Sequence, residues 1–148
     1  MDKELVSVEL KEIRSYQFEA RFGDGVPDLV CDEPPPLGAG AGPSPVQLLA
    51  AAVGNCLSDS LTFAFKKYKQ EAGPLSVRVV ASVGRNETGR LRVLQIEVWL
   101  KLGVLAGALM HVDRVLAQFE AFCTVTQSVG QGIPIALHVQ DVAGQILK

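Results

Sequence analysis

Two cysteines, Cys56 and Cys123, are the residues whose types and settings point most directly to chemistry. Cys56 lies in the middle of a long expected helix, in the segment AAVGNCLS, and Cys123 lies where a second expected helix ends, in FCTVTQS. A thiol buried in the wall of one helix and a thiol at the end of another can meet in space. That layout suits a thiol that reacts with peroxide and a partner that resolves the product, and nothing else in the chain offers a competing chemistry.

The chemistry of such a pair sets three requirements. A thiolate attacks the O–O bond of a hydroperoxide and becomes a sulfenic acid, a second thiol condenses with it to a disulfide, and an external dithiol restores both thiols by exchange. The first thiol needs a low pKa, the second must lie within bonding distance, and the peroxide needs a pocket. Sixty-seven residues separate the two cysteines, so only the fold can bring their Cα atoms within about 7 Å.

The thiol of Cys56 needs a neighbour that stabilises its charged form. Because Cys56 is expected in mid-helix, the helix dipole cannot lower its pKa, and a cation or hydrogen-bond donors must do so. Arg21 is the preferred cation, although it also fits a solvated residue on a polar strand face with Gln17 and Glu19. Ser60 shares the helix face of Cys56 and could donate to the thiolate, or bond back to the helix carbonyls.

The remaining candidates for chemistry are weak. Cys31 has no comparable setting and is interpreted as a bystander. His111 and His138 stand alone, without the spacing of metal ligands, so no metal site is expected. The glycines of residues 38–42 are not followed by the Gly-Lys-Ser/Thr of a phosphate loop, and no cofactor is expected.

Size and composition limit the class of protein. A chain of 148 residues is expected to form one domain, residues 1–148. Its hydrophobic fraction of 48% is more than one domain of this size hides easily, which favours a large apolar interface and a homodimer. The net charge of −2 and the lack of a basic stripe argue against nucleic acid as a partner. We see no signal peptide, and the longest apolar runs are far short of the roughly 20 residues of a membrane span, so we expect a soluble, cytoplasmic protein.

The first third of the chain predicts short strands followed by a loop and a long helix. Alternating apolar residues predict a half-buried strand over residues 6–11, a strand over 16–22 and a short strand over 29–31, with a turn at 23–25. Residues 32–45 are rich in Pro and Gly and predict a loop. Ser44 and Gln47 form a capping box, so a helix should run from Pro45 to about Gln70. Its first half is apolar almost all round, which predicts burial on every side.

The rest of the chain predicts a hairpin, helices and a final strand. Strands are expected over residues 77–83 and 94–100 with a turn at 86–89, and a helix over 106–122. A short helix or turn should occupy 124–130 and a strand 133–139. The order of elements indicates an α+β fold of antiparallel strands and two substantial helices.

At this point the residues resemble a known family. Residues 42–56 (GPSPVQLLAAAVGNC) are similar to the central helix of the OsmC/Ohr family, the osmotically inducible and organic hydroperoxide resistance proteins. Residues 122–129 (FCTVTQSV) resemble its second cysteine segment, and residues 32–38 its loop. The resemblance implies antiparallel sheets wrapped around central helices in an intertwined homodimer, with two active sites at the subunit interface.

The resemblance also implies roles for single residues. It makes Cys56 the peroxidatic cysteine, Cys123 the resolving cysteine and Arg21 the thiolate-stabilising arginine, in a reduction of organic hydroperoxides that uses an external dithiol such as a lipoyl group. One position departs from the family: where the peroxidase branches carry a glutamate that holds the arginine, this chain has Val46. That departure keeps a second hypothesis open, a non-catalytic protein that binds a small apolar ligand at the dimer interface. A redox sensor is the third.

Overall fold

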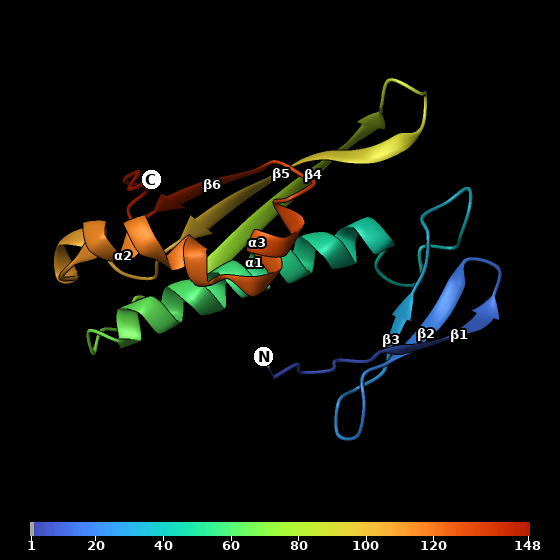
Figure 1. The fold of residues 1–148 in the computed structure, drawn as a ribbon, viewed down its shortest axis with the longest axis horizontal. Helices are drawn as coiled ribbons and strands as arrows, with labels where there is room; N and C mark the ends of the chain where they lie inside the picture. Colours follow the sequence, from blue (N-terminus) through green and yellow to red (C-terminus); the bar gives the residue numbers. More distant parts are fainter. Residues whose placement is uncertain (1) are drawn as a thin grey trace. The chain divides into compact units, whose positions relative to one another are not determined.

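The structure, a computed structural model, describes residues 2–148 as two compact units. Unit 1 ends at Leu48 and unit 2 runs from Leu49 to Lys148, so the long helix begins in one unit and continues in the other. Figure 1 shows strands and helices in the expected order along the chain. The expectation of a single domain stays a prediction.

Unit 1 contains a small antiparallel sheet in the order β1-β2-β3. Its strands are β1 (Glu9–Arg14), β2 (Gln17–Arg21) and β3 (Leu29–Cys31). A tight turn with Tyr16 at φ 69° joins β1 to β2, and Gly23 and Gly25 take the positive φ angles of the predicted turn before β3. The first strand begins three residues later than predicted, and all its residues are exposed rather than half-buried, because nothing in this sheet covers it.

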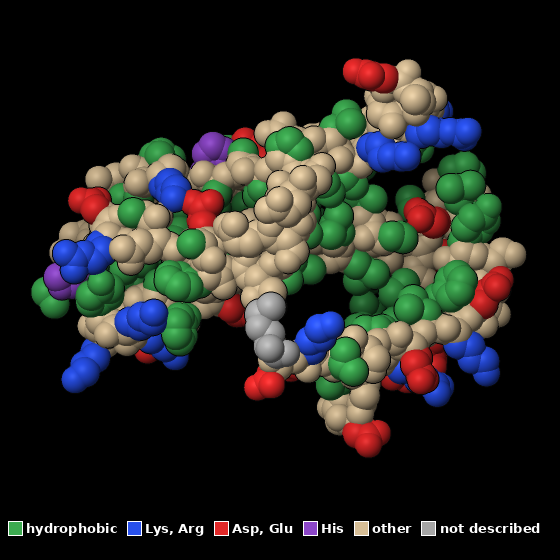
Figure 2. Space-filling model, viewed as in Figure 1, with side chains coloured by type: hydrophobic (Ala, Val, Ile, Leu, Met, Phe, Trp, Pro, Cys, Tyr) green, Lys and Arg blue, Asp and Glu red, His purple; other side chains and the backbone are tan. Residues whose placement is uncertain are grey.

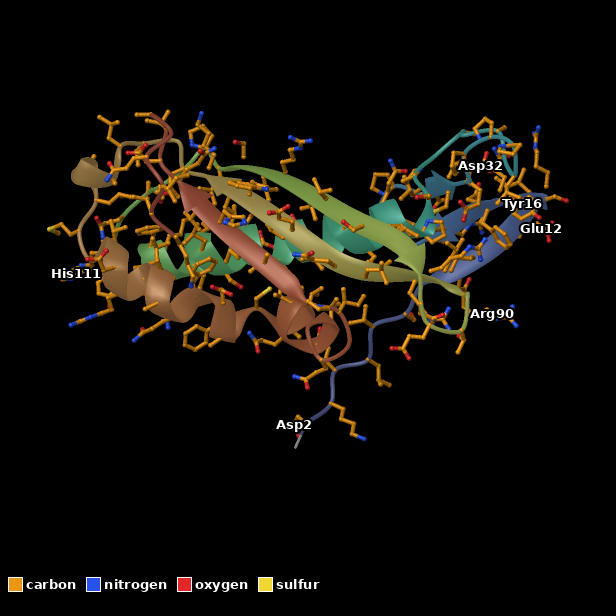
Figure 3. All side chains as sticks on the ribbon, turned by 90° about the horizontal axis from the view of Figure 1, so that it is seen from above. Asp2, Glu12, Tyr16, Asp32, Arg90 and His111 are labelled. Atoms are coloured by element: carbon orange, nitrogen blue, oxygen red, sulfur yellow. The ribbon has the colours of Figure 1, made fainter. Side chains whose placement is uncertain are left out.

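A buried carboxylate organises the loop that follows β3. Asp32 is only 2% exposed and lies at the start of this loop (Figure 3). Its side chain accepts hydrogen bonds from the backbone N–H groups of Glu33 (2.8 Å), Ala39 (3.2 Å) and Ala41 (3.0 Å). A hydrogen bond from the Asp32 N–H to the Pro43 carbonyl (3.1 Å) closes the loop at its far end. The Pro- and Gly-rich segment is therefore an ordered loop.

The helix α1 (Pro45–Lys66) begins where the capping box predicts. The Gln47 N–H donates to Ser44 Oγ (3.3 Å), and the Ser44 N–H donates to Gln47 Oε1 (2.9 Å). The helix ends about four residues before the predicted end. Its last turn tightens as the Lys69 N–H bonds to the Lys66 carbonyl, three residues back, and Lys69 itself takes a positive φ of 56°.

One stripe of α1 is buried, rather than every side. The buried residues recur at three- and four-residue spacing: Val53, Gly54, Leu57, Leu61 and Phe65. Ala51 and Ala52 are exposed, so the prediction of burial on all sides is wrong for this chain by itself. By length and composition α1 could also cross a membrane, with a mean hydropathy of 1.4 over a window of which 28% is buried. Core helices of globular proteins pass the same test, and the buried stripe of α1 packs as such a helix does.

Unit 2 contains a second sheet in the order β4-β5-β6. β4 (Ser76–Arg85) and β5 (Leu91–Lys101) form the predicted antiparallel hairpin, whose turn carries Arg90 (Figure 3). β6 (Ile135–Gln140) pairs with β5 in parallel, which corrects the expectation of antiparallel strands throughout. The parallel pairing follows from the long helical crossover between β5 and β6, which returns the chain to the end of the sheet from which β5 started.

The crossover is built from four short helical segments, three of which replace the single helix predicted over 106–122. They are η1 (Ala106–Ala108), α2 (Val112–Gln118), η2 (Phe119–Phe122) and α3 (Thr124–Val129). His111, which precedes α2 (Figure 3), has a φ of 60° that no α-helix accommodates, and this breaks the predicted helix. Of the short helix or turn predicted over 124–130, the structure has the helix, α3.

The core of unit 2 lies between its sheet and its helices. Most of the fully buried side chains come from three sources: α1, the inner face of β5 and β6, and the α2–η2 segment. They include Leu57, Leu61, Phe65, Ile96, Val98, Leu100, Phe119 and Val139. α1 packs so closely on β4 that a Cβ on Gly54 would lie 2.7 Å from Val79 Cγ2. The α+β fold class is confirmed.

Candidate active site

Cys56 lies on α1 at the edge of the buried stripe. It is half-buried and packs against the core of unit 2 between the buried neighbours Val53 and Leu57. Two residues before Cys56, Gly54 lies close against β4, and this close packing fixes the position of the helix on the strand. The thiol is thus held on a rigid helix but keeps part of its surface open.

Cys123 lies at the junction of η2 and α3 and has no exposed surface. Its backbone is extended (φ −82°, ψ 100°), which ends η2 and lets α3 start at the next residue. The Cys123 thiol donates a hydrogen bond to Thr126 Oγ1 at 3.0 Å. Thr126 is itself only 6% exposed. Cys123 therefore belongs to the core of unit 2 and has a polar partner there.

The fold brings the two cysteine side chains together. Cys56 and Cys123 both belong to unit 2, and the Cys123 side chain lies near enough to act on the pKa of Cys56. Both are free thiols in this structure, as is Cys31. The two residues are therefore neighbours in unit 2, whereas a Cα separation within bonding distance and the chemical roles of the two thiols stay predictions.

The surroundings of Cys56 act on its pKa in both directions. Burial and then the hydrogen bond with Cys123 raise the pKa of Cys56 above its ordinary value, because both favour the protonated thiol. The backbone N–H groups of Val125 and Thr126, at the start of α3, oppose this by favouring the thiolate. Sequence analysis missed these amides. The expected short helix directly after Cys123 was the available signal, since a helix begins with unpaired N–H groups.

Arg21 lies in unit 1, at the end of β2, and its side chain is 59% exposed. Its guanidinium pairs with Glu19 Oε1 at 2.8 Å and with Asp28 Oδ2 at 3.7 Å. The hydrogen bond and charge of Glu19, followed by the charge of Asp28, raise the pKa of Arg21. Carboxylates of its own unit therefore hold this arginine. Val46, in the first turn of α1, supplies no carboxylate.

The other candidate residues from the sequence have surroundings of their own. Cys31 is buried in β3 of unit 1, and Ser60 is half-buried one turn after Cys56. His138 stacks on Trp99 with ring centroids 4.0 Å apart, and His111 packs against Tyr68. Among residues 2–148 no three His, Cys, Asp or Glu side chains are grouped as metal ligands.

Comparison with known proteins gives a consistent family and fold. The family described as OsmC-like protein matches residues 38–138. An OsmC-like protein of unknown function from Vibrio cholerae is 16% identical, with a TM-score of 0.78 over 93% of this chain and 100% of its own. An organic hydroperoxide resistance protein from Elizabethkingia anophelis is 20% identical, with a TM-score of 0.72 over 95% and 99%. The organic hydroperoxide resistance protein OhrB of Bacillus subtilis is 19% identical, with a TM-score of 0.69 over 93% and 98%. No curated protein sequence matches.

Proposed function

The chain belongs to the OsmC-like protein family, and on that premise we propose that it reduces organic hydroperoxides with Cys56 and Cys123 as its redox pair. The observation that carries the proposal is that Cys123, from a distant part of unit 2, lies near enough to Cys56 to act on its pKa. The names of two structural relatives, organic hydroperoxide resistance proteins, give the substrate class. A role in defence against peroxides in the cytoplasm follows, where dithiol reductants are available.

The proposed reaction has three steps. The Cys56 thiolate attacks the distal oxygen of ROOH, which breaks the O–O bond, releases ROH after protonation and leaves Cys56 as a sulfenic acid. The Cys123 sulfur then attacks the sulfenic sulfur, and water leaves as the disulfide forms. An external dithiol supplies two electrons by exchange and restores both thiols. Cys56 is the partly exposed thiol of the pair, so it meets the peroxide first.

Peroxide turnover with matched variants tests the assignment. Purified protein with an organic hydroperoxide and dihydrolipoamide should consume peroxide, and Cys56→Ser should abolish this. Cys123→Ser should still oxidise at Cys56 once but form no intramolecular disulfide. Peptide mapping of the oxidised protein should find the Cys56–Cys123 bridge. Full activity of Cys56→Ser would refute the proposal.

Arg21 is the cation that we propose for the Cys56 thiolate. Burial and Cys123 raise the pKa of Cys56 in the single chain, and a nearby positive charge would oppose this by stabilising the reactive thiolate. Glu19 and Asp28 hold the guanidinium of Arg21 in the absence of a carboxylate at Val46. Arg21→Ala should slow the oxidation of Cys56 by an organic hydroperoxide at pH 7. Arg14→Ala, on the neighbouring strand β1, is the matched control and should leave the rate unchanged. Equal rates in both variants would remove Arg21 from the mechanism.

A homodimer is the assembly that we propose. Several large apolar side chains are exposed in the single chain, among them Phe63 (57%) on α1 and Phe122 (60%) beside Cys123. Hydrophobic side chains also reach the surface in Figure 2. A second copy of the chain that covers part of this surface would bury these rings and enclose the thiols further.

The raised pKa of Cys56 favours a second candidate function, a protein that binds a small apolar ligand without catalysis. A thiol that stays protonated would then serve only as part of an apolar wall. The apolar cleft lined by Phe63 and Phe119 in unit 2 has a volume of about 60 Å³, well below the roughly 300–1,000 Å³ of small-molecule sites, so such a ligand would need a larger cavity at the dimer interface. Hydroperoxide turnover by the wild-type protein that depends on Cys56 would exclude it.

A further inference from the structure

Thr126 is a buried polar residue that the proposed reaction does not yet use. Its side chain is 6% exposed, and its Oγ1 lies 3.0 Å from the sulfur of Cys123, which has no exposed surface at all. Its backbone N–H acts on the neighbouring sulfur of Cys56. One residue of α3 therefore bonds to Cys123 through its side chain and acts on the pKa of Cys56 through its backbone N–H.

The hydroxyl of Thr126 can serve both protonation states of Cys123. In the structure the Cys123 thiol donates to Thr126 Oγ1. A hydroxyl is both donor and acceptor, so after Cys123 loses its proton the Thr126 O–H can turn and donate to the sulfur. A buried charge without a hydrogen bond is costly, and no water-exposed surface remains on Cys123 to relieve it. Thr126 is thus placed to stabilise a Cys123 thiolate inside the core.

The two sulfurs differ in access. Cys56 is half-buried, whereas Cys123 is fully buried. The direction of thiol–disulfide exchange depends on which sulfur can be attacked and on how well the other leaves as a thiolate. Access favours attack at Cys56, and the Thr126 hydroxyl favours departure of Cys123. Both factors point to the same direction of opening.

We propose that Thr126 is a positioning residue that directs the regeneration step, so that the external dithiol attacks Cys56 and Cys123 leaves as a thiolate hydrogen-bonded to the Thr126 hydroxyl. The proposal rests on the redox pair of the proposed function. The dithiol thiolate forms a bond to the Cys56 sulfur while the Cys56–Cys123 bond breaks, and its electron pair stays on Cys123. The second thiol of the reductant then attacks the mixed disulfide, releases Cys56 and closes the reductant into a cyclic disulfide. Two electrons pass from the dithiol to the protein.

The first measurement follows opening of the disulfide independently of peroxide. The Cys56–Cys123 disulfide is made with diamide in the wild type, in Thr126→Val and in Thr126→Ser, and its reduction by dithiothreitol is followed by quenched alkylation. Thr126→Val keeps the shape and loses the hydroxyl, so we expect reduction about tenfold slower, the size of one lost hydrogen bond to a charged group. The equilibrium should shift by a similar factor toward the disulfide, about 30 mV in potential for a tenfold change. Thr126→Ser restores the hydroxyl and should restore most of the rate.

The second measurement identifies the attacked sulfur. A monothiol, 2-mercaptoethanol, opens the disulfide, the mixture is quenched with acid and N-ethylmaleimide, and peptides are analysed by mass spectrometry. We expect the 2-mercaptoethanol adduct on Cys56 and N-ethylmaleimide on Cys123. An adduct on Cys123, or equal rates in Thr126→Val and the wild type, would overturn the proposal. Because diamide replaces peroxide, these results are obtained even if the protein proves inactive with hydroperoxides, so the two failures are distinguishable.

Discussion

At the scale of single residues, the thiol of Cys56 is poised between opposing influences. Burial and Cys123 raise its pKa, and the amides of Val125 and Thr126 lower it. The contact with Cys123 is the influence that a substitution can remove without altering α1. It therefore offers a direct measure of how strongly one thiol of the pair controls the other.

The first prediction is that Cys123→Ala lowers the pKa of Cys56. The hydrogen bond with Cys123 and the charge of its sulfur both raise that pKa, so their removal increases the thiolate fraction of Cys56 at pH 7–8. Alkylation by iodoacetamide should be several times faster at pH 7.5, and the midpoint of its pH profile should lie below that of the wild type. Cys31→Ala, in unit 1, is the control and should change neither quantity. A midpoint that stays the same or rises in Cys123→Ala would contradict this account of the pair.

A second prediction at this scale concerns Asp32, whose carboxylate holds the loop after β3. Hydrogen bonds from the backbone N–H of Ala41, followed by those of Ala39 and Glu33, depress the pKa of Asp32 despite the opposing effect of burial. A depressed folded-state pKa means that the stabilisation is fully present above the unfolded value of about 3.9 and is lost as pH falls through the folded value. The loop should therefore keep its hydrogen bonds at neutral pH and lose them in acid.

Hydrogen exchange measures this directly. In Asp32→Asn the amides of Ala39 and Ala41 should exchange faster at neutral pH, because the neutral side chain is a weaker acceptor and its NH₂ group repels one of the donors. Asp24→Asn, an exposed substitution in the turn before β3, is the matched control. If both amides kept their protection from exchange in Asp32→Asn, contacts other than the Asp32 carboxylate would hold the loop.

At the scale of elements, the close packing of α1 on β4 depends on Gly54, which has no side chain. A Cβ at Gly54 would lie 2.7 Å from Val79 Cγ2 and 3.6 Å from both Val77 methyl carbons, so helix or strand must shift to accept it. Cys56 follows two residues later on the same helix, and a shift of α1 would move its thiol relative to Cys123. Packing at Gly54 is thus connected to the geometry of the redox pair.

We predict that Gly54→Ala destabilises the protein. Overpacking of about 1–3 kcal/mol outweighs the roughly 1 kcal/mol that alanine contributes to helix formation, which leaves a net loss on the order of 1 kcal/mol in the free energy of unfolding. Urea unfolding should show a lower midpoint. Adding Val79→Ala should recover part of the loss, since it removes the methyl group that the new Cβ meets. Gly132→Ala, where a Cβ meets nothing within 4 Å, is the control. A stabilised Gly54→Ala would mean that α1 moves freely on β4.

The elements also show which parts of this structure were predictable. The start of α1 was predictable because Ser44 and Gln47 make their hydrogen bonds within four residues of each other. The parallel pairing of β6 was not, since β5 and β6 are joined by a long crossover whose path depends on packing. The left-handed backbone conformation of His111 was not predictable either, because the apolar pattern of the predicted helix continues through this residue.

The candidate site likewise has parts that the sequence predicted and parts that it did not. The settings of Cys56 and Cys123 identified the pair from the sequence, because each lies in a recognisable local frame. The amides of Val125 and Thr126 that reach Cys56 come from a segment about seventy residues away. The carboxylates that hold Arg21 were only partly foreseen: Glu19 was its expected neighbour on the strand, whereas Asp28 joins it across a turn. Contacts that the fold alone brings together are the ones that the sequence did not reveal.

At the scale of the whole molecule, the two units carry opposite charge. Residues 1–48 contain nine acidic and four basic residues, and residues 49–148 contain seven acidic and ten basic residues, so the units have net charges of −5 and +3. Arg85, Arg90 and Arg92 lie at or beside the β4–β5 turn, and Figure 2 shows basic side chains among those that reach the surface. Opposite net charges within the chain favour electrostatic attraction between copies of it. Together with the exposed apolar side chains, this charge distribution suits self-association.

The last prediction is that the protein is an obligate homodimer and that Phe63 lies in its interface. Sedimentation should give twice the chain mass of 15.8 kDa at nanomolar concentration, and the unfolding midpoint should rise with concentration. Phe63 is 57% exposed in one chain, so in a monomer Phe63→Glu would change stability by no more than about 0.5 kcal/mol. If Phe63 lies in a dimer interface, the same change places a buried charge there and should dissociate the dimer or unfold the protein. Lys66→Glu, an exposed charge change on the same helix, is the control. A stable, folded monomer of the wild type at nanomolar concentration would refute the dimer, and a dimeric Phe63→Glu variant of unchanged stability would place Phe63 outside the interface.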